Sequence, residues 1–292
     1  MIAAEGAPAP RRTRRMPVGL LLVLPPVALI ILFVLYPALF AIYNTFQVKD
    51  GGQFVLSLQN YLTFFSDPQS RRNLFLTVWT TVITTVMLIA FCLPIAAYLR
   101  FSTGRLPTIV QSIAVFPLFV PGIIVAYALI RVIGSNGIVA TVLDHLGISG
   151  YQTPYLTPWG SVIGLFWEGI PLTLLVLLSG MSQVPMAAIE AARDVGAGSM
   201  RIAVHIILPL IKNSLLIAFS LEFLAIFGSF TTPYLLGPAS PEMMGVYMQR
   251  TFNDVHDPIQ AQTQAVVSFV ICSAIGILYV RAIGRRREAG RP

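Results

Sequence analysis

Two carboxylates stand inside long apolar runs of this sequence, where ionisable groups are rare. They are Glu168 and Glu222, and the aromatic residues near them in the sequence are Trp167, Phe227, Phe230 and Tyr234. A charge at the centre of a bilayer costs at least about 2.5 kcal/mol unless it faces protein or water, so such acids are candidates for a transport pathway. Because carboxylates and aromatic rings both attract cations, we expect these residues to line a pathway for a cationic substrate.

A structural role is the alternative for Glu168 and Glu222. Each acid would then accept hydrogen bonds from neighbouring helices or pair with a basic residue at an interface with a partner. The two interpretations differ in what a Gln replacement does. In the pathway interpretation, it weakens uptake of the cation without abolishing assembly with partner proteins.

A short polar segment at residues 185–198 separates two apolar runs. Pro185 suits the first turn of a helix, where a missing N–H group costs nothing. The residues that recur at helical spacing on one side are Met186, Ile189, Ala192 and Val195, and those on the other side are Glu190, Arg193 and Asp194. Gly196 and Gly198 predict the end of this helix, and Pro209 predicts a bend where the next apolar run begins. From amphipathicity alone, an ordinary interfacial helix lying on lipid headgroups is the favoured interpretation.

Several other kinds of chemistry lack their residues. The sequence has no G-x-x-x-x-G-K-[ST] phosphate loop and no G-x-S-x-G elbow, so neither nucleotide binding of that kind nor serine hydrolysis is expected. Its histidines, His145, His205 and His256, are too far apart for a metal site, and we expect none. Cys92 and Cys272 lie in apolar stretches and are interpreted as core thiols.

The elements that position these residues are six apolar runs. Apolar residues make up 56% of the chain and charged residues 11%, which excludes an ordinary soluble domain and predicts an all-α membrane protein. The runs long enough to cross a bilayer, at about 20 residues each, lie at about 18–44, 73–99, 108–133, 159–181, 207–235 and 262–283. They predict one six-helix domain over residues 17–285, after a disordered basic N-terminus over 1–16 and before a tail over 286–292.

The basic residues give this domain a direction. With the N-terminus inside, the cytoplasmic segments hold 14 of the 19 Lys and Arg residues and the outer segments hold 5. The positive-inside rule then places both termini, the tail and the 185–198 helix in the cytoplasm. The formal charge of +7 is therefore interpreted as a topology signal rather than as a nucleic-acid surface.

The spacing around the polar helix resembles a known family. Glu190-Ala191-Ala192, three residues, Gly196, nine residues and then Ile206-x-Leu208-Pro209 is similar, without a mismatch, to the EAA signature of the permease subunits of binding-protein-dependent ABC importers. The resemblance implies a type I importer permease of the MetI-like fold in a bacterial inner membrane. It also implies that the 185–198 segment between spans four and five is a coupling helix. The residues that would couple to the ATPase are Glu190, Ala191, Ala192, Arg193, Asp194, Gly196 and Pro209.

The same resemblance implies the partners. They are a cytoplasmic ATPase dimer that binds ATP and Mg, a second permease chain and an extracytoplasmic solute-binding protein. The second permease is either a copy of this chain or a homologue, and in the polyamine-like branch the two usually differ. This chain would then be a transport subunit and no enzyme. A secondary transporter is the alternative of another class, but its inverted repeats with broken helices are not found. A membrane scaffold without a transport role is a further alternative.

Different segments of the chain resemble different substrate branches of this permease family. Residues 116–130, 192–197 and 227–238 resemble the spermidine/putrescine and opine permeases, while residues 166–185, "FWEGIPLTLLVLLSGMSQVP", are about as similar to the sugar-importer branch. Together with the two acids, this predicts a polyamine-like cation. A sugar, an opine, a phosphonate and a ferric ion remain as alternatives.

Overall fold

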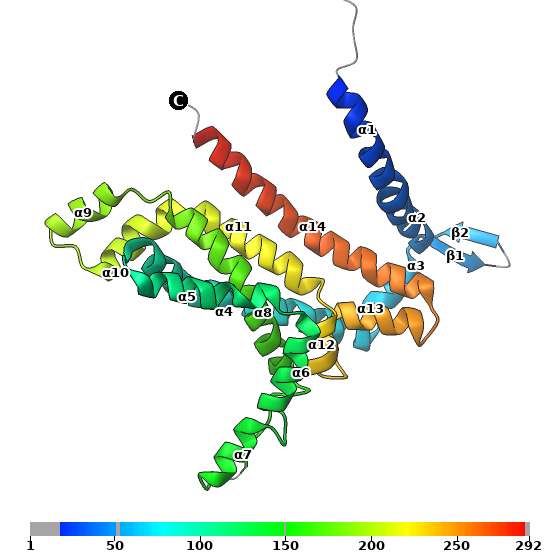
Figure 1. Ribbon diagram of the computed structural model, residues 1–292. Helices are drawn as coiled ribbons and strands as arrows, with labels where there is room; N and C mark the ends of the chain where they lie inside the picture. The colour runs from blue at the N-terminus through cyan, green and yellow to red at the C-terminus, as the bar shows by residue number, and fades with distance from the viewer. Residues whose placement is uncertain (1–17, 51–52, 149, 290–292) are drawn as a thin grey trace, which may run out of the picture. The chain divides into compact units, whose positions relative to one another are not determined.

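The computed structural model describes residues 18–50, 53–148 and 150–289 (Figure 1). The chain divides into two units, Met1–Ser57 and Leu58–Pro292, which are described separately below. The predicted N-terminal segment over 1–16 lies outside the described residues, as do the last three residues of the predicted tail over 286–292. Residues 286–289 of that tail belong to the last helix.

The first unit is an apolar helix followed by a small hairpin. It consists of α1 (Val18–Ile30), a π-helical turn η1 (Ile31–Leu35), α2 (Tyr36–Thr45), β1 (Gln47–Asp50) and β2 (Gln53–Leu56). The strands are antiparallel, with Gln47 opposite Leu56. Large apolar side chains such as Leu22 and Phe33 are exposed within the unit, at 72% and 69%. A helix that is apolar on all sides is typical of a membrane span.

The second unit is made of helices. Its first half comprises α3 (Gln59–Ser66), α4 (Pro68–Phe101), α5 (Arg105–Val115), a 3₁₀ turn η2 (Phe116–Phe119), α6 (Gly122–Ile133), α7 (Ile138–His145) and α8 (Pro158–Met181). Its second half comprises α9 (Met186–Asp194), α10 (Ser199–Ile202), a π-helical turn η3 (Ala203–Ile207), α11 (Leu208–Phe227), α12 (Thr231–Leu236), α13 (Met244–Asn253) and α14 (Pro258–Ala289). The packed centre is formed by α4, α8 and α11, with α14 lying along α11.

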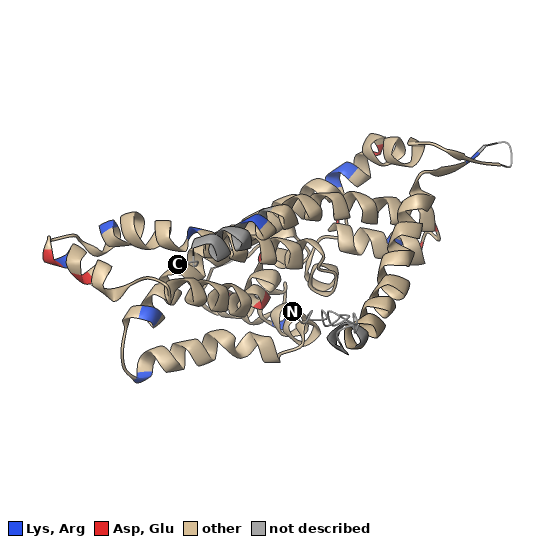
Figure 2. Cartoon of the chain, turned by 90° about the horizontal axis from the view of Figure 1, so that it is seen from above, with Lys and Arg blue, Asp and Glu red and all other residues tan. Residues whose placement is uncertain are grey.

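Six helical stretches of the described chain are long and apolar enough to cross a membrane. They span residues 22–45, 68–101, 122–145, 158–181, 199–227 and 258–281. This confirms the predicted all-α architecture with six membrane helices, and α9 lies between the fourth and the fifth. Figure 2 shows that Lys, Arg, Asp and Glu gather toward helix ends and loops, with both signs at the outer end of the α9 region.

The third span differs from its prediction. Instead of one helix over 108–133, the chain forms α5 and η2, breaks at Val120, and begins α6 at Gly122. Val120 is extended (φ −105°, ψ 120°) because a residue before proline, here Pro121, is disfavoured in the helical region. The stretch long enough to span is therefore α6 with α7, which continues beyond the predicted end.

The fifth span also shifts. The apolar pattern predicts 207–235, whereas the helical stretch runs from Ser199 to Phe227 and α12 follows as a separate helix. Pro209 lies inside this continuous stretch rather than at a break. The chain accommodates it by the π-turn η3, in which the Leu208 N–H bonds to the Ala203 carbonyl, since a proline cannot supply the usual helical donor. The turn η1 stands before Pro37 in the same way.

Gly160 and Gly164 allow α12 to lie close to α8. A Cβ atom at Gly160 would collide with the Leu236 carbonyl oxygen, and one at Gly164 would collide with the side chain of Thr232. This is the close approach that a G-x-x-x-G spacing permits between membrane helices. The contact holds Thr232 beside the middle of α8, where Glu168 lies.

Candidate functional site

Glu168 and Glu222 line the same small cavity. It has a volume of about 130 Å³ and lies between α8 and α11. The other lining residues are Leu165, Gly169, Leu172, Ala225, Ile226 and Ser229. Two carboxylates that come from separate helices and face one space inside an apolar bundle form the most concentrated negative site among the predicted spans.

Glu222 is the more buried of the two acids and is hydrogen-bonded to α8. The residue is 1% exposed, and the Thr173 hydroxyl donates a hydrogen bond of 2.8 Å to its Oε1. Gly169 makes room for the carboxylate, because a Cβ atom there would lie 3.0 Å from Glu222 Oε2 and would collide with Leu88. One hydrogen bond leaves most of the acceptor capacity of a carboxylate available for a ligand or water.

Glu168 is the more open acid. It is half-buried, and the Thr232 hydroxyl donates a hydrogen bond of 2.6 Å to its Oε1. A Cβ atom at Gly122 would lie 2.7 Å from the same oxygen, so the start of α6 approaches the carboxylate closely. The amino end of a helix carries partial positive charge. Glu168 is therefore positioned by three elements, α8, α12 and α6.

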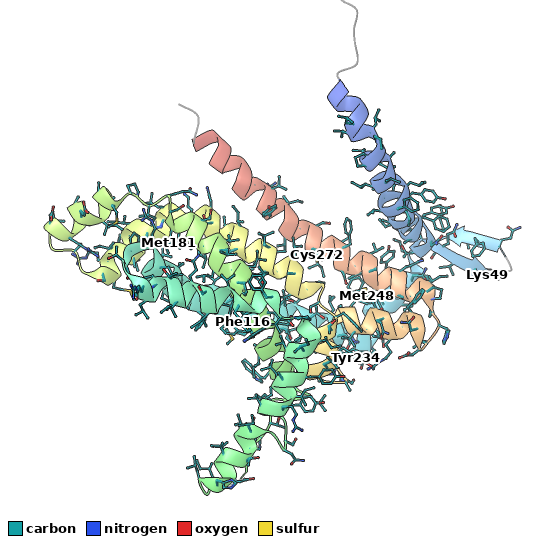
Figure 3. All side chains as sticks on the ribbon, viewed as in Figure 1. Lys49, Phe116, Met181, Tyr234, Met248 and Cys272 are labelled. Carbon is teal, nitrogen blue, oxygen red and sulfur yellow. The ribbon has the colours of Figure 1, made fainter. Side chains whose placement is uncertain are left out.

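The predicted aromatic residues do not line the cavity. Phe227 is 2% exposed and stacks on Phe223, with ring centroids 5.6 Å apart. Phe230 and Tyr234 stack on each other with centroids 5.4 Å apart at an exposed surface, where Tyr234 is labelled on α12 in Figure 3. Trp167 is half-buried beside Glu168 in sequence. The structure thus brings the two acids together and places the aromatic rings around other surfaces.

The predicted coupling segment forms α9, with Pro185 as the residue before its first turn. Its end is a Schellman motif, in which the Gly196 N–H bonds to the Arg193 carbonyl at 2.8 Å and the Ala197 N–H bonds to the Ala192 carbonyl at 2.9 Å. Gly196 has φ +80°, a conformation that favours glycine. The sequence prediction of a glycine-terminated helix is therefore confirmed at this position.

The charged face of α9 is exposed. Its exposed residues are Glu190, Ala191, Arg193 and Asp194, and in the described chain the one ion pair lies elsewhere, between Arg250 and Glu242. Ala192 is half-buried, and Gly196 and Pro209 are exposed. Exposed charges without ion-pair partners in their own chain offer contacts to another molecule.

The other face of α9 is anchored. Ile189 is 2% exposed and belongs to a cluster with Leu177, Met181 and Ile202; Met181 is labelled at the end of α8 in Figure 3. Beside it lies a cavity of about 510 Å³. The residues that line it are Pro94, Ala97, Phe101, Ile189, Arg193, Ser199, Met200, Ile202, Ala203 and Ile207. The helix thus joins this cluster through Ile189 and, less deeply, through Ala192.

A buried polar network at the amino end of α4 is absent from the predictions. Asn73 Oδ1 accepts a hydrogen bond of 3.0 Å from the Glu242 N–H, and Glu242 pairs with Arg250 at 2.9 Å. Burial raises the pKa of Glu242, Arg250 opposes the shift and Asp254 adds to it. The sequence signal is the segment at 237–242, whose residue types indicate only a turn. In the described residues no group of three His, Cys, Asp or Glu side chains forms a metal site.

Comparison with known proteins gives a family. Residues 93–289 match the model of a family described as binding-protein-dependent transport system inner membrane component. The chain is 27% identical to the sulfoquinovosyl glycerol transport system permease protein SmoG of Agrobacterium fabrum, covering 97% of both chains. It is 28% identical to the spermidine/putrescine transport system permease protein PotB of Salmonella typhimurium, covering 87% of this chain and 89% of that protein.

The fold also has solved counterparts. A chain of a bacterial alginate ABC transporter in complex with an alginate pentasaccharide-bound periplasmic protein is similar with a TM-score of 0.75 and 16% identity, covering 94% of this chain and 95% of that chain. A chain of the MetNI methionine ABC transporter is similar with a TM-score of 0.56 and 17% identity, covering 75% and 95%. At these identities the likeness concerns the arrangement of the helices.

Proposed function

Because this chain belongs to the family of inner membrane components of binding-protein-dependent transport systems, we propose that it forms one half of the translocation pathway for a small solute in an ATP-binding cassette importer. It is a multi-pass permease of the inner membrane, and ATP hydrolysis takes place in a separate subunit. In the proposed assembly, a soluble binding protein delivers the solute and a second permease chain supplies the other half of the pathway. The ATPase subunits bind ATP and Mg.

In this proposal, α9 is the contact with the ATPase. The supporting observation is that Glu190, Arg193 and Asp194 are exposed. The one buried residue of this helix is Ile189. Charged groups at such a rim guide association and select the partner. We place α9 and both chain termini in the cytoplasm, as the distribution of basic residues predicts.

A polyamine-like cation is the proposed substrate class. The observation that carries it is the common cavity of Glu168 and Glu222, since a pair of carboxylates in an apolar span attracts an ammonium group. PotB, whose name specifies spermidine and putrescine, supports the same class. The cavity of about 130 Å³ is smaller than the usual ligand pocket of about 300 Å³ or more, so it would hold one ammonium end of a solute rather than all of it.

A sugar is the second candidate. It is favoured by SmoG, whose name specifies sulfoquinovosyl glycerol and which is similar over 97% of both chains. The chemistry separates the candidates, because a sugar sulfonate is anionic and two carboxylates in the pathway would repel it. Sulfoquinovosyl glycerol and putrescine therefore make contrasting probes.

The test is uptake into proteoliposomes that contain this chain with the proposed ATPase, second permease and binding protein. Radiolabelled putrescine should accumulate only with internal ATP, the ATPase and the binding protein, whereas sulfoquinovosyl glycerol should not accumulate. Accumulation in liposomes that lack the ATPase would contradict the importer proposal. Accumulation of sulfoquinovosyl glycerol but not of putrescine would agree with the importer proposal and contradict the proposal of a cationic substrate.

A further inference from the structure

The helix α4 has two faces of opposite character. Its inward face carries a row of fully buried threonines: Thr77, Thr80, Thr81, Thr84 and Thr85. On the opposite face, Phe75, Val82 and Val86 are 72%, 39% and 50% exposed. Polar groups inside and apolar groups outside are the arrangement of a helix whose outer face meets an apolar medium.

A cavity lies at the amino end of this outer face. It has a volume of about 770 Å³. The residues that line it are Pro68, Arg71, Arg72, Phe75, Leu76, Trp79, Pro158, Trp159 and Pro241. The lining contains two guanidinium groups and no carboxylate, so it is electrostatically the opposite of the cavity lined by Glu168 and Glu222. Both α4 and α8 begin here, and their amino ends add positive potential.

The charges of Arg71 and Arg72 are not neutralised by ion pairing within the described chain, where the one ion pair joins Arg250 to Glu242. Asp67 is the nearest acid in sequence, but its carboxylate caps α4 by accepting bonds from the Gln69 and Ser70 N–H groups and from the Ser70 hydroxyl. These bonds, and to a smaller extent Arg71, lower the pKa of Asp67, against a rise from burial. Two arginines outside any ion pair are suited to a phosphate group.

A second cavity continues the first one along α4. It has a volume of about 350 Å³, and it shares Phe75 and Trp79 with the arginine cavity. The residues that line it are Phe75, Val78, Trp79, Val82, Ile83 and Val86. From Phe75 to Val86 the helix rises about 16 Å, which is close to the depth of one leaflet, about half of a 30 Å hydrocarbon core.

Trp79 and Trp159 line the same cavity as Arg71 and Arg72, at the basic end of the groove. Their rings make an edge-to-face contact with centroids 5.4 Å apart, and Trp159 is 48% exposed. Tryptophan is enriched at the level of lipid headgroups. The groove therefore has a basic end with an aromatic pair beside it, which suits headgroup depth, and an apolar track that runs from there along α4 to Val86.

We propose that this groove binds one anionic phospholipid, with its phosphate at Arg71 and Arg72 and an acyl chain along Phe75, Val82 and Val86. The net negative charge of phosphatidylglycerol complements a lining that has two cations and no acid. A polyamine does not fit this site, because its charge has the same sign as the arginines. The site is thus separate from the substrate proposal and rests only on the membrane location of the chain.

Native mass spectrometry of the full chain, released from nanodiscs of equal parts phosphatidylglycerol and phosphatidylethanolamine, tests this proposal. The wild-type chain should retain one phosphatidylglycerol in preference to phosphatidylethanolamine. The double variant Arg71→Gln with Arg72→Gln should retain it at least about tenfold less, which is about 1.4 kcal/mol. The matched control is Arg105→Gln with Arg131→Gln, which removes two exposed arginines outside both cavities and should leave retention unchanged.

Two further arms identify the part of the lipid that is bound. Val86→Trp fills the apolar track without a change of charge and should also lower retention. Water-soluble glycerol 3-phosphate at the same concentration should not displace the lipid. Equal retention by the wild-type chain and the double arginine variant would overturn the proposal. So would cross-linking of a Val82→Cys variant to the second permease in most molecules, because a protein helix would then occupy the track.

Discussion

The α9 helix and the acid cavity are both polar features in an apolar chain, but the charges of α9 are open to solvent and those of the cavity are enclosed by other helices. The charges of α9 are exposed and have no ion-pair partner in the described chain, whereas Glu222 is 1% exposed and bonded to Thr173 of another helix. The role proposed for α9 therefore requires a second protein, whereas the environment of Glu222 is set by the packing of this chain. A surface helix tolerates local change, while a buried carboxylate constrains every helix around it.

Charge reversal at Glu190 should give the largest effect. In the proposed contact, Glu190 pairs with a basic group of the ATPase. Glu190→Lys should leave the chain in the membrane but bring two like charges together there, which costs several kcal/mol. We expect association with the ATPase to weaken about 100-fold, measured by co-purification and by ATP-dependent uptake. Asp144→Lys reverses an exposed acid on α7 and is the matched control. Normal co-purification and transport by the Glu190 variant would remove α9 from the interface.

Neutralising Glu222 should reduce uptake of a diamine without loss of assembly. Glu222→Gln keeps the shape but removes the charge, and the loss of a charged hydrogen bond is worth about 1.5–3 kcal/mol, or about tenfold or more in initial rate. Thr173→Val removes the donor while keeping the charge, so its effect should be smaller. The measurement is labelled putrescine uptake with co-purification as the check on assembly. Unchanged uptake in the Gln variants of both acids would leave them with a structural role only.

Replacing Glu168 should lower uptake less than replacing Glu222 does, because Glu168 is less buried. We expect Glu168→Gln to lower diamine uptake about threefold, which is about 0.7 kcal/mol. Gly122→Ala should act in the same direction through position alone, since its Cβ would lie 2.7 Å from Glu168 Oε1. Gly276→Ala, in α14 with open space around it, serves as its control. If the two glycine variants transport equally, α6 does not position Glu168.

The smallest effect should come from the end of α9. Gly196 has φ +80°, whereas Gly198 has φ −70°, and a Cβ atom added at either glycine would meet no other atom within 4 Å. Gly196→Ala should loosen the last turn by about 1–2 kcal/mol, seen as faster amide exchange in α9. Gly198→Ala should leave exchange nearly unchanged. Equal exchange in the two variants would show that the left-handed residue does not fix the helix end.

Local signals were sufficient to predict α9. Its end depends on Gly196, and its faces follow from the spacing of Ile189 and Glu190, all within a few residues of one another. The burial of Glu222 in a helix was also visible from its apolar neighbours. What no local pattern contained was the rotation of α8 and α11 about their axes, which brings Glu168 and Glu222 to one cavity and turns Phe227 away from it.

The differences between the predicted and the observed spans have a related cause. Mean hydropathy is blind to backbone geometry, so it joined α5 to α6 across Pro121 and missed that α6 and α7 form the longer stretch. The pairing of Glu242 with Arg250 was hidden because the end of a loop and most of α13 separate them in sequence. Such contacts depend on a tertiary arrangement that only the folded chain supplies.

The packing of Ile189 connects α9 to its neighbouring helices. Its side chain belongs to the same cluster as Leu177 and Met181 of α8 and Ile202 of α10. If α9 binds the ATPase as proposed, this cluster is the apolar contact through which a displacement of α9 would reach both helices. Ile189→Ala would remove most of this contact and should weaken the coupling of α9 to α8 and α10 while leaving the backbone connections of α9 intact.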